Sequence, residues 1–252
     1  MSQVYSTIRE RKQQNKKSLA VLIDPDKTSP DHCIGIAKEA TLCNLDFFFI
    51  GSSILTQNHL HDCIKALKNT CNIPVILFPG NIMQVSGEAD AILFLSLISG
   101  RNPELLIGNH VLSAPLIRSS KLEVIPTGYM LIDSGSPTSA SYMSQTFPIP
   151  HNKNDIAECT AMAGELLGMK AIYLDAGSGA RFPVSTSMVS AVRNKIEVPL
   201  IVGGGIKSAE KAIELCQAGA DIIVVGNALE TEQGLMAELA DAVKGHQTKG
   251  LL

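Results

Sequence analysis

Two carboxylates stand one residue apart near the start of this sequence, in the segment LIDPDK. Asp24 and Asp26 follow an apolar run, and Pro25 fixes the turn between them. Such a pair suits a hard cation that prefers oxygen ligands, and Ser52 and Ser53, after the next apolar run, would add hydroxyl oxygens. A Mg²⁺ ion held by one carboxylate and one hydroxyl would keep its other positions for water and phosphate oxygens, as a diphosphate substrate requires. The alternative interpretation is that Asp24 or Asp26 caps the helix that follows.

Glycine-rich turns follow the last three apolar runs of the chain, in the segments YLDAGSGA, PLIVGGGIKS and DIIVVGNALE. A strand that ends in such small residues often lets a ligand approach its backbone. The N–H groups of Gly204, Gly205, Gly226 and Asn227, aimed by helix N-termini, could hold a phosphate dianion without a lysine. The alternative is that these segments are merely tight turns.

Asp175 ends the apolar run AIYLD, directly before the first of these turns. A carboxylate at that position could accept a hydroxyl proton or orient a polyol. It could equally be a strand-end aspartate that caps the next turn. Tyr173, two residues earlier, either lines a cavity or fills the interior of a barrel.

These residues meet only if the apolar runs form one parallel sheet. The runs are continuous rather than alternating, as expected for strands that are covered on both faces. Segments with apolar residues three and four apart lie between them and predict amphipathic helices. The predicted strands are 18–23, 45–50, 74–78, 90–96, 124–132, 170–175, 198–202 and 221–225. The predicted helices are 31–43, 58–68, 103–113, 153–168, 186–195, 208–218 and 231–244.

Eight strand–helix units in 252 residues predict an α/β fold, a single-domain (β/α)₈ TIM barrel over residues 1–252. A doubly wound open sheet would carry its glycine-rich fingerprint after the first strand, whereas here the glycines follow strands six to eight. In a barrel, the loops after strands seven and eight often bind phosphate. The long irregular insert 133–152 is predicted to be a lid or the wall of a channel.

Composition excludes several classes of protein. The net charge of −3 gives no electrostatic case for nucleic-acid binding. The six cysteines form no CxxC pair and are expected to be reduced thiols of a cytoplasmic protein. The N-terminal run SLAVLI ends at Asp24 without a signal-peptide cleavage site, and no stretch reaches the roughly 20 apolar residues of a membrane span.

Eight motifs carry a resemblance that extends over nearly the whole chain. Single pieces such as GGGI are shared by many phosphate-binding barrels, but the combination of DPDK, YLxAGSGA and GGGIKS is far more specific. In order, the motifs are LIDPDK, IGSS, FPG, ILFLSLISGRNPE, PTGY, YLDAGSGA, VGGGIKS and VVGNALE. Together they resemble the geranylgeranylglyceryl phosphate synthase family, and most of all its larger branch, found in archaea and some bacteria.

The resemblance implies an enzyme that joins sn-glycerol 1-phosphate to a long prenyl diphosphate, such as geranylgeranyl diphosphate, with Mg²⁺ required. Asp24 and Ser53 match the family's Mg²⁺ positions, and Asp24 and Asp175 are the expected catalytic residues. The residues that match the glycerol phosphate site are Tyr173, Leu174, Asp175, Ala176, Gly177, Ser178, Gly179, Gly204, Gly205, Gly226 and Asn227.

The sequence departs from the family pattern at two positions. Asp175 stands where the family typically has Glu, so the carboxylate is one methylene shorter and its contact with the substrate hydroxyl is in question. Leu22 stands where the smaller bacterial branch has a Lys, two residues before the metal Asp. Another group must therefore do here whatever that Lys does there.

Further expectations concern the rest of the substrate and the partners. The prenyl tail needs an apolar groove, for which FFFI (47–50), ILFLSLI (92–98) and the insert 133–152 are candidates. A homo-oligomer, dimer or hexamer, is expected, with peripheral membrane contact for product release. The rival interpretations are an FMN-dependent oxidoreductase barrel and a non-catalytic barrel that binds a phosphate ligand.

Overall fold

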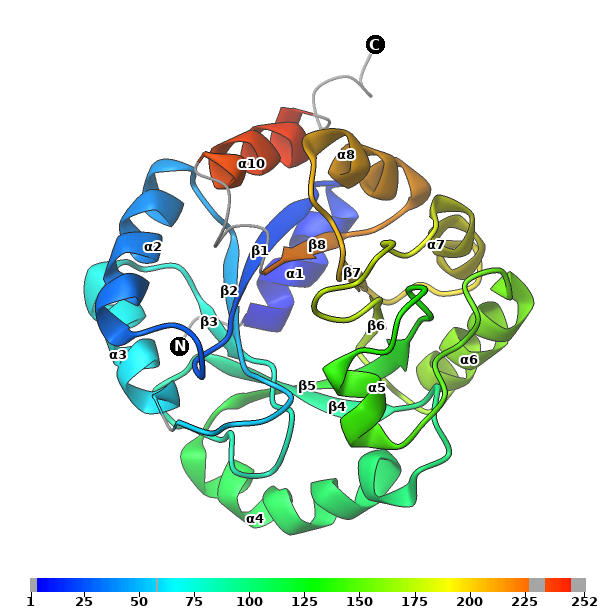
Figure 1. Ribbon diagram of the computed structural model, residues 1–252, viewed down its shortest axis with the longest axis horizontal. Helices are drawn as coiled ribbons and strands as arrows, with labels where there is room; N and C mark the ends of the chain where they lie inside the picture. Colours follow the sequence, from blue (N-terminus) through cyan, green and yellow to red (C-terminus); the bar gives the residue numbers. More distant parts are fainter. Residues whose placement is uncertain (1–3, 58, 227–233, 246–252) are drawn as a thin grey trace.

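A computed structural model describes residues 4–57, 59–226 and 234–245 of the chain. Eight parallel strands close into a barrel in which β1 pairs with both β2 and β8 (Figure 1). This confirms the predicted TIM barrel. The strands are β1 (Ser18–Ile23), β2 (Phe47–Ile50), β3 (Val75–Leu77), β4 (Ala91–Leu97), β5 (Glu123–Leu131), β6 (Ala171–Asp175), β7 (Leu200–Gly203) and β8 (Ile222–Val225).

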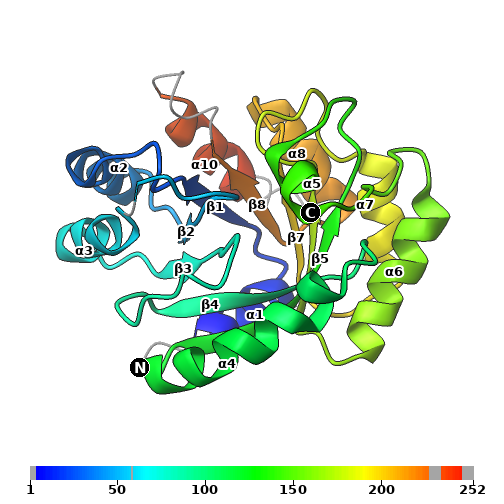
Figure 2. The same ribbon diagram turned by 60° about the horizontal axis from the view of Figure 1, so that its bottom comes forward.

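Helices surround this barrel as a ring (Figures 1 and 2). Helix α8 (Ala209–Ala218) is capped at both ends: the Ser208 side chain accepts a hydrogen bond from Lys211 N at its start, and Gly219 adopts φ 115° at its end. None of the described helices is long and apolar enough to cross a membrane. The ring consists of α2 (Pro30–Leu42), α3 (Leu60–Thr70), α4 (Asn109–Ser120), α6 (Asn154–Leu166), α7 (Thr186–Arg193), α8 (Ala209–Ala218) and α10 (Leu235–Gly245).

The charged N-terminal segment forms a helix that the sequence analysis did not predict. This helix, α1 (Val4–Gln13), buries Val4 and Ile8 against the side chains that fill the barrel interior. The Glu123 carboxylate at the start of β5 accepts hydrogen bonds from the N–H groups of Val4 and Tyr5, at 2.5 and 3.0 Å. These contacts satisfy donors that a helix start leaves free, and α1 closes the end of the barrel where the strands begin.

The connections around β4 differ from a regular barrel. Residues 78–90, between β3 and β4, contain no helix. After β4, a π-helical turn, η1 (Glu104–Gly108), leads into α4. The predicted helix 103–113 ends too early, because Pro115 lies inside α4 instead of ending it.

The insert after β5 is more ordered than the expected irregular loop. It contains a short helix, α5 (Ser139–Ser144), which begins with a capping box between Thr138 and Ser141. Ile132 and Ile149 form an isolated bridge that ties the two ends of the insert together. The insert is therefore a folded element at the barrel rim.

Side chains of β4 alternate between two cores. Ala91 and Leu93 belong to the cluster that fills the barrel, whereas Ile92 belongs to the layer between sheet and helices. Phe94 packs against that outer layer as well. This alternation lets β4 present apolar side chains both to the barrel interior and to α4.

Candidate active site

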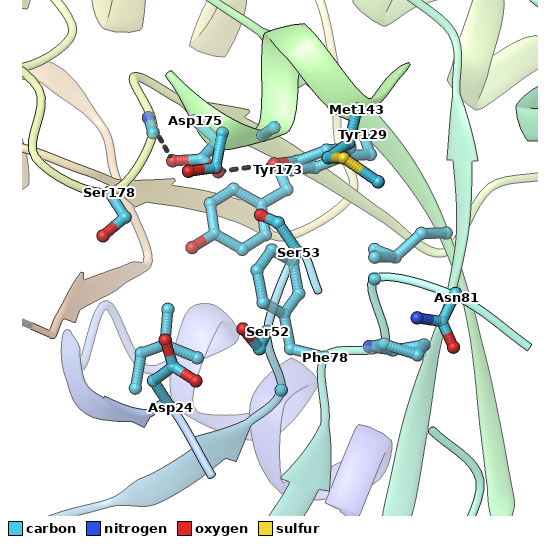
Figure 3. A pocket seen from close by; sticks show the side chains of 18 of the residues that line it. Asp24, Ser52, Ser53, Phe78, Asn81, Tyr129, Met143, Tyr173, Asp175 and Ser178 are labelled. Carbon is cyan, nitrogen blue, oxygen red and sulfur yellow. Dashed lines mark hydrogen bonds between the residues drawn. The ribbon is translucent and has the colours of Figure 1, made fainter. Parts of the chain in front are cut away.

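A pocket of about 560 Å³ opens at the carboxyl ends of the strands. The barrel brings the carboxylates after β1 and β6 and the glycine turns after β6, β7 and β8 to this one cavity, as the sequence analysis expected. Figure 3 shows side chains from several of these elements converging on it. Its polar lining includes Asp24, Asp26, Lys27, Ser52, Ser53, Tyr129, Asp175, Ser178 and Lys207.

At one end of the pocket lies Asp24, directly after β1, and Ser53, which follows the neighbouring strand β2, is drawn between Asp24 and Asp175 (Figure 3). Asp24 accepts a hydrogen bond from Asp26 N at 3.0 Å and pairs with Lys27 Nζ at 3.3 Å. The Ser52 hydroxyl donates to Ile54 O at 2.8 Å, whereas the Ser53 hydroxyl makes no hydrogen bond to another described residue. Of the two serines, Ser53 is thus the one whose oxygen is available to a ligand.

Asp26 is not available as a metal ligand in this structure. Its carboxylate accepts hydrogen bonds from Gln57 N at 2.6 Å, Thr56 N at 2.6 Å and the Thr56 hydroxyl at 2.9 Å. These donors, the Gln57 N–H first, hold the pKa of Asp26 below its usual value. Neither Asp24 nor Asp26 caps α2, since Ser29 performs that role. Asp26 instead ties the loop after β1 to the loop after β2.

Gln84 is a positioning residue that the sequence analysis missed. Its side chain is 1% exposed and forms two hydrogen bonds with the Ser52 backbone, accepting from N at 3.0 Å and donating to O at 2.7 Å. The loops after β2 and β3 meet tightly here, because a Cβ on Gly80 would lie 2.0 Å from Ser52 O. No local motif marks Gln84, because its partners lie 32 residues away.

At the opposite end of the pocket lies Asp175, which is only 7% exposed. The Tyr129 hydroxyl donates to Oδ2 at 2.5 Å and Gly177 N donates to Oδ1 at 2.7 Å (Figure 3). Burial raises the pKa of Asp175, and these two hydrogen bonds oppose the rise. Asp175 thus anchors the turn after β6 and also faces the pocket, so both interpretations of this residue find structural support.

Two tyrosines surround this carboxylate. Burial, with Asp175 nearby, places the pKa values of Tyr129 and Tyr173 well above their usual range, so both hydroxyls stay protonated. Tyr173 stacks on Phe78, with ring centroids 5.2 Å apart, and is 1% exposed while it lines the pocket. Tyr173 therefore both fills the barrel and forms the pocket floor. Tyr129 lies in the PTGY motif, but no role was predicted for it.

The glycine turns after β6 and β7 pack backbone against backbone. Gly204 has φ +84°, and a Cβ on it would lie 2.6 Å from Gly177 N. Gly205 has φ +71°, and its Cβ would meet the Ala180 side chain and the Pro183 backbone at 3.1 Å. The N–H groups of Gly204 and Gly205 make no hydrogen bond to another described residue, so both are free for an anion.

The other predicted phosphate-site residues divide into three groups. Ser178, Gly179 and Gly226 line the pocket, as do Gly177 and Asp175. Leu174 and Ala176 do not line it, because alternation along the strand directs their side chains into the outer core. Asn227 lies outside the described residues.

An apolar arm of the pocket runs from the barrel mouth towards α4. Leu95 and Leu97 line it near the barrel, and α5 contributes Ala140 and Met143 to its wall. The segment FFFI is absent from its lining, so that candidate for a tail groove is wrong, because these residues pack in the cores. Between β4 and α4, the arm is lined by Val85, Ile92, Phe94, Leu105, His110, Ser113 and Ile117.

Comparison with known proteins identifies the family. Residues 9–245 match the PcrB family. The chain is 57% identical over 242 residues to a protein of Chitinophaga pinensis named geranylgeranylglyceryl phosphate synthase, and the alignment covers 96% of both chains. This chain belongs to the PcrB family. A relative from the archaeon Methanosphaera stadtmanae, with the same name as the Chitinophaga pinensis protein, is 43% identical over 209 residues, which cover 83% of this chain and 85% of its own.

Solved structures agree with the assignment to the PcrB family. The crystal structure of (S)-3-O-geranylgeranylglyceryl phosphate synthase from Thermoplasma acidophilum, in complex with sn-glycerol-1-phosphate, matches with a TM-score of 0.92 and 32% identity. The match covers 97% of this chain and 100% of that one. The tryptophan synthase α chain of Legionella pneumophila, with a TM-score of 0.59 and 17% identity, shares only the fold.

Proposed function

We propose that this protein is a Mg²⁺-dependent prenyltransferase. It joins sn-glycerol 1-phosphate to geranylgeranyl diphosphate, or a similar long prenyl diphosphate, and releases diphosphate. One observation carries the proposal: a single pocket combines free glycine N–H groups, a buried carboxylate and a long apolar arm. A small anion and a long hydrocarbon chain are the two ligands that these surfaces fit. The names of its PcrB-family relatives support the same reaction.

Glycerol phosphate is proposed to bind at the turns after β6, β7 and β8. Its phosphate accepts hydrogen bonds from the N–H groups of Gly204 and Gly205, and Gly226 lines the same part of the pocket. Asn227, which the family resemblance adds to this site, lies outside the described residues. Its hydroxyl groups then face Asp175, which lies beside these turns at the end of β6. The Thermoplasma acidophilum structure, solved in complex with sn-glycerol-1-phosphate, supports glycerol phosphate as the ligand.

Asp24 and Ser53 are the proposed Mg²⁺ ligands. Their oxygen donors are of the type that Mg²⁺ prefers, and the Ser53 hydroxyl makes no hydrogen bond to another described residue. No group of three His, Cys, Asp or Glu side chains suited to a metal occurs in the described part of the chain. Mg²⁺ held by few protein ligands and by substrate phosphates does not require such a group. When bound, the ion would neutralise charge on the departing diphosphate.

The chemistry proceeds by breaking the bond between C1 of the prenyl group and the diphosphate oxygen, which keeps the electron pair. The free C3 hydroxyl of glycerol phosphate forms the new ether bond to C1. Asp175 orients this hydroxyl and accepts its proton, helped by a raised pKa that makes the carboxylate a stronger base. The apolar arm holds the tail and keeps water away from the allylic carbon.

Location and assembly are part of the proposal. All six cysteines are free thiols, as a cytoplasmic location predicts. The side chains of Ile107, Val111, Leu112 and Leu116, on η1 and α4, are more than half exposed, which supports a homo-oligomer, a dimer or hexamer, that covers this face. Contact with a membrane at product release remains an expectation, because the ether product is largely hydrocarbon.

The test combines purified protein, Mg²⁺, labelled sn-glycerol 1-phosphate and prenyl diphosphates of increasing length. We expect a labelled ether product and stoichiometric diphosphate release, and we expect Asp24→Asn to lose nearly all turnover while keeping its circular dichroism spectrum. Chelation of Mg²⁺ should abolish the wild-type rate as well. If no prenyl diphosphate yields product although glycerol phosphate binds, the protein is a phosphate-binding barrel without this activity.

A further inference from the structure

The pocket must accept two anionic substrates, although its own side chains carry little positive charge. Among the described residues that line it, Asp24, Asp26 and Asp175 are acidic, while Lys27 and Lys207 are the two lysines. The lysines lie at different ends of the pocket: Lys207 follows the glycine turn after β7, and Lys27 lies beside Asp24. Lys27 is therefore the one described lysine at the end where the diphosphate is proposed to bind.

Among the described residues, the Lys27 ammonium has one charged partner, Asp24, and the contact is weak. Its Nζ lies 3.3 Å from Asp24 Oδ2, and its side chain is 55% exposed, against 18% for Asp24. Ion pairs that are this exposed contribute little to stability, so the ammonium can exchange its partner at small cost. A cation bound at Asp24 would compete with Lys27 for the same carboxylate.

We propose that Lys27 binds the leaving diphosphate and exchanges Asp24 for it when Mg²⁺ is bound. This inference rests on the proposed function. Without ligands, the ammonium neutralises Asp24. With Mg²⁺ at Asp24, the ammonium is free to donate charge-assisted hydrogen bonds to diphosphate oxygens beside the ion. It then stabilises the negative charge that the leaving group gains as the C1–O bond breaks.

The exchange predicts that removal of the ammonium raises the affinity for the metal ion and lowers the affinity for diphosphate. In Lys27→Met, Mn²⁺ alone, used as a probe for Mg²⁺, should bind up to about fivefold more tightly, because its competitor for Asp24 is gone. Inorganic diphosphate, titrated at saturating Mg²⁺, should bind at least about tenfold more weakly, because a charged hydrogen-bond donor is lost. Both affinities are measured by isothermal titration calorimetry.

Two further variants complete the experiment. Lys27→Arg keeps the charge and should retain most of the diphosphate affinity, whereas Lys38→Met, on the exposed surface of α2, should change neither affinity. Weaker Mn²⁺ binding with unchanged diphosphate affinity in Lys27→Met would overturn the inference, since Lys27 would then only position Asp24. If the wild type forms no ether product, the proposed function fails. If the wild type forms the product but the diphosphate affinity of Lys27→Met equals that of the wild type, this inference alone fails.

Discussion

Asp175 is a buried carboxylate without a cationic partner among the described residues. Its two hydrogen bonds, from Tyr129 and Gly177, satisfy one lone pair on each oxygen and leave others for a substrate hydroxyl. Asp175→Asn keeps the shape and the acceptor for Gly177 N but removes the base. We expect kcat to fall about 10²–10⁴-fold with little change in Tm. A variant that melts several degrees lower yet turns over normally would show that Asp175 serves only the turn.

Tyr129 sets the pH range in which Asp175 works. Its hydrogen bond to the ionised carboxylate lowers the pKa of Asp175, against the larger effect of burial. Tyr129→Phe removes that contribution, so the pKa rises further and the carboxylate is protonated at higher pH. The acid side of the kcat profile should therefore shift to higher pH in Tyr129→Phe. Tyr5→Phe, at the other end of the barrel, is the control; equal profiles for both variants would contradict this role.

The loops after β1 and β2 act as one element because Asp26 joins them. Asp26→Asn weakens the bonds to the N–H groups of Thr56 and Gln57 and loosens the loop that presents Ser53. We expect faster hydrogen exchange at these two amides and weaker Mn²⁺ binding, without a large loss of Tm. Asp31→Asn, in the first turn of α2, is the matched control. An unchanged hydrogen-exchange rate at the Thr56 amide would show that Asp26 does not hold the two loops together in solution.

The turns after β6 and β7 tolerate side chains at some positions and not at others. Gly179 has φ +73° with nothing near its Cβ direction, so Gly179→Ala should cost only the strain of a left-handed residue, about 1–2 kcal/mol. Gly204→Ala adds a collision with the Gly177 backbone and should cost at least twice as much in urea unfolding. An equal loss of unfolding free energy in the two variants would mean that the turns after β6 and β7 move apart easily.

At the scale of the whole molecule, the apolar arm lies apart from the glycine turns, so the proposed binding sites of the tail and of the phosphate are separate. Ser113 lines the arm, and Ser113→Phe should fill it. Each methylene of the prenyl tail that stays in water loses about 0.8 kcal/mol of binding free energy, so the KM for geranylgeranyl diphosphate should rise roughly tenfold or more. The Kd of glycerol phosphate should stay constant, and so should both constants in the control variant Ser187→Phe, on the exposed side of α7. A parallel rise in both constants would indicate general damage.

The pattern of apolar residues and the positions of the turn residues were enough to predict the barrel. Its strands are buried on both faces, and glycines follow the last three strands. They also pointed to the two aspartates after β1, the two serines after β2 and the glycine turns, whereas the choice of Asp24 and Ser53 came from the family resemblance. The charged segment that forms α1 was missed, because its helix depends on contacts with β5. Tyr129 and Gln84 were missed for a similar reason: each acts on a partner 46 or 32 residues away. Asp26 was a candidate metal ligand because the sequence does not show that its carboxylate accepts hydrogen bonds from Thr56 and Gln57.

The apolar arm of the pocket has a thermodynamic consequence. The arm beside β4 and α4 presents apolar side chains to water until a prenyl chain covers them. Covering apolar surface lowers the heat capacity, whereas a phosphate bound by backbone N–H groups covers little of it. Calorimetry over a range of temperatures should therefore give a strongly negative ΔCp for the prenyl substrate and a small one for glycerol phosphate. On warming, the enthalpy of prenyl binding becomes steadily more favourable, while that of glycerol phosphate changes little.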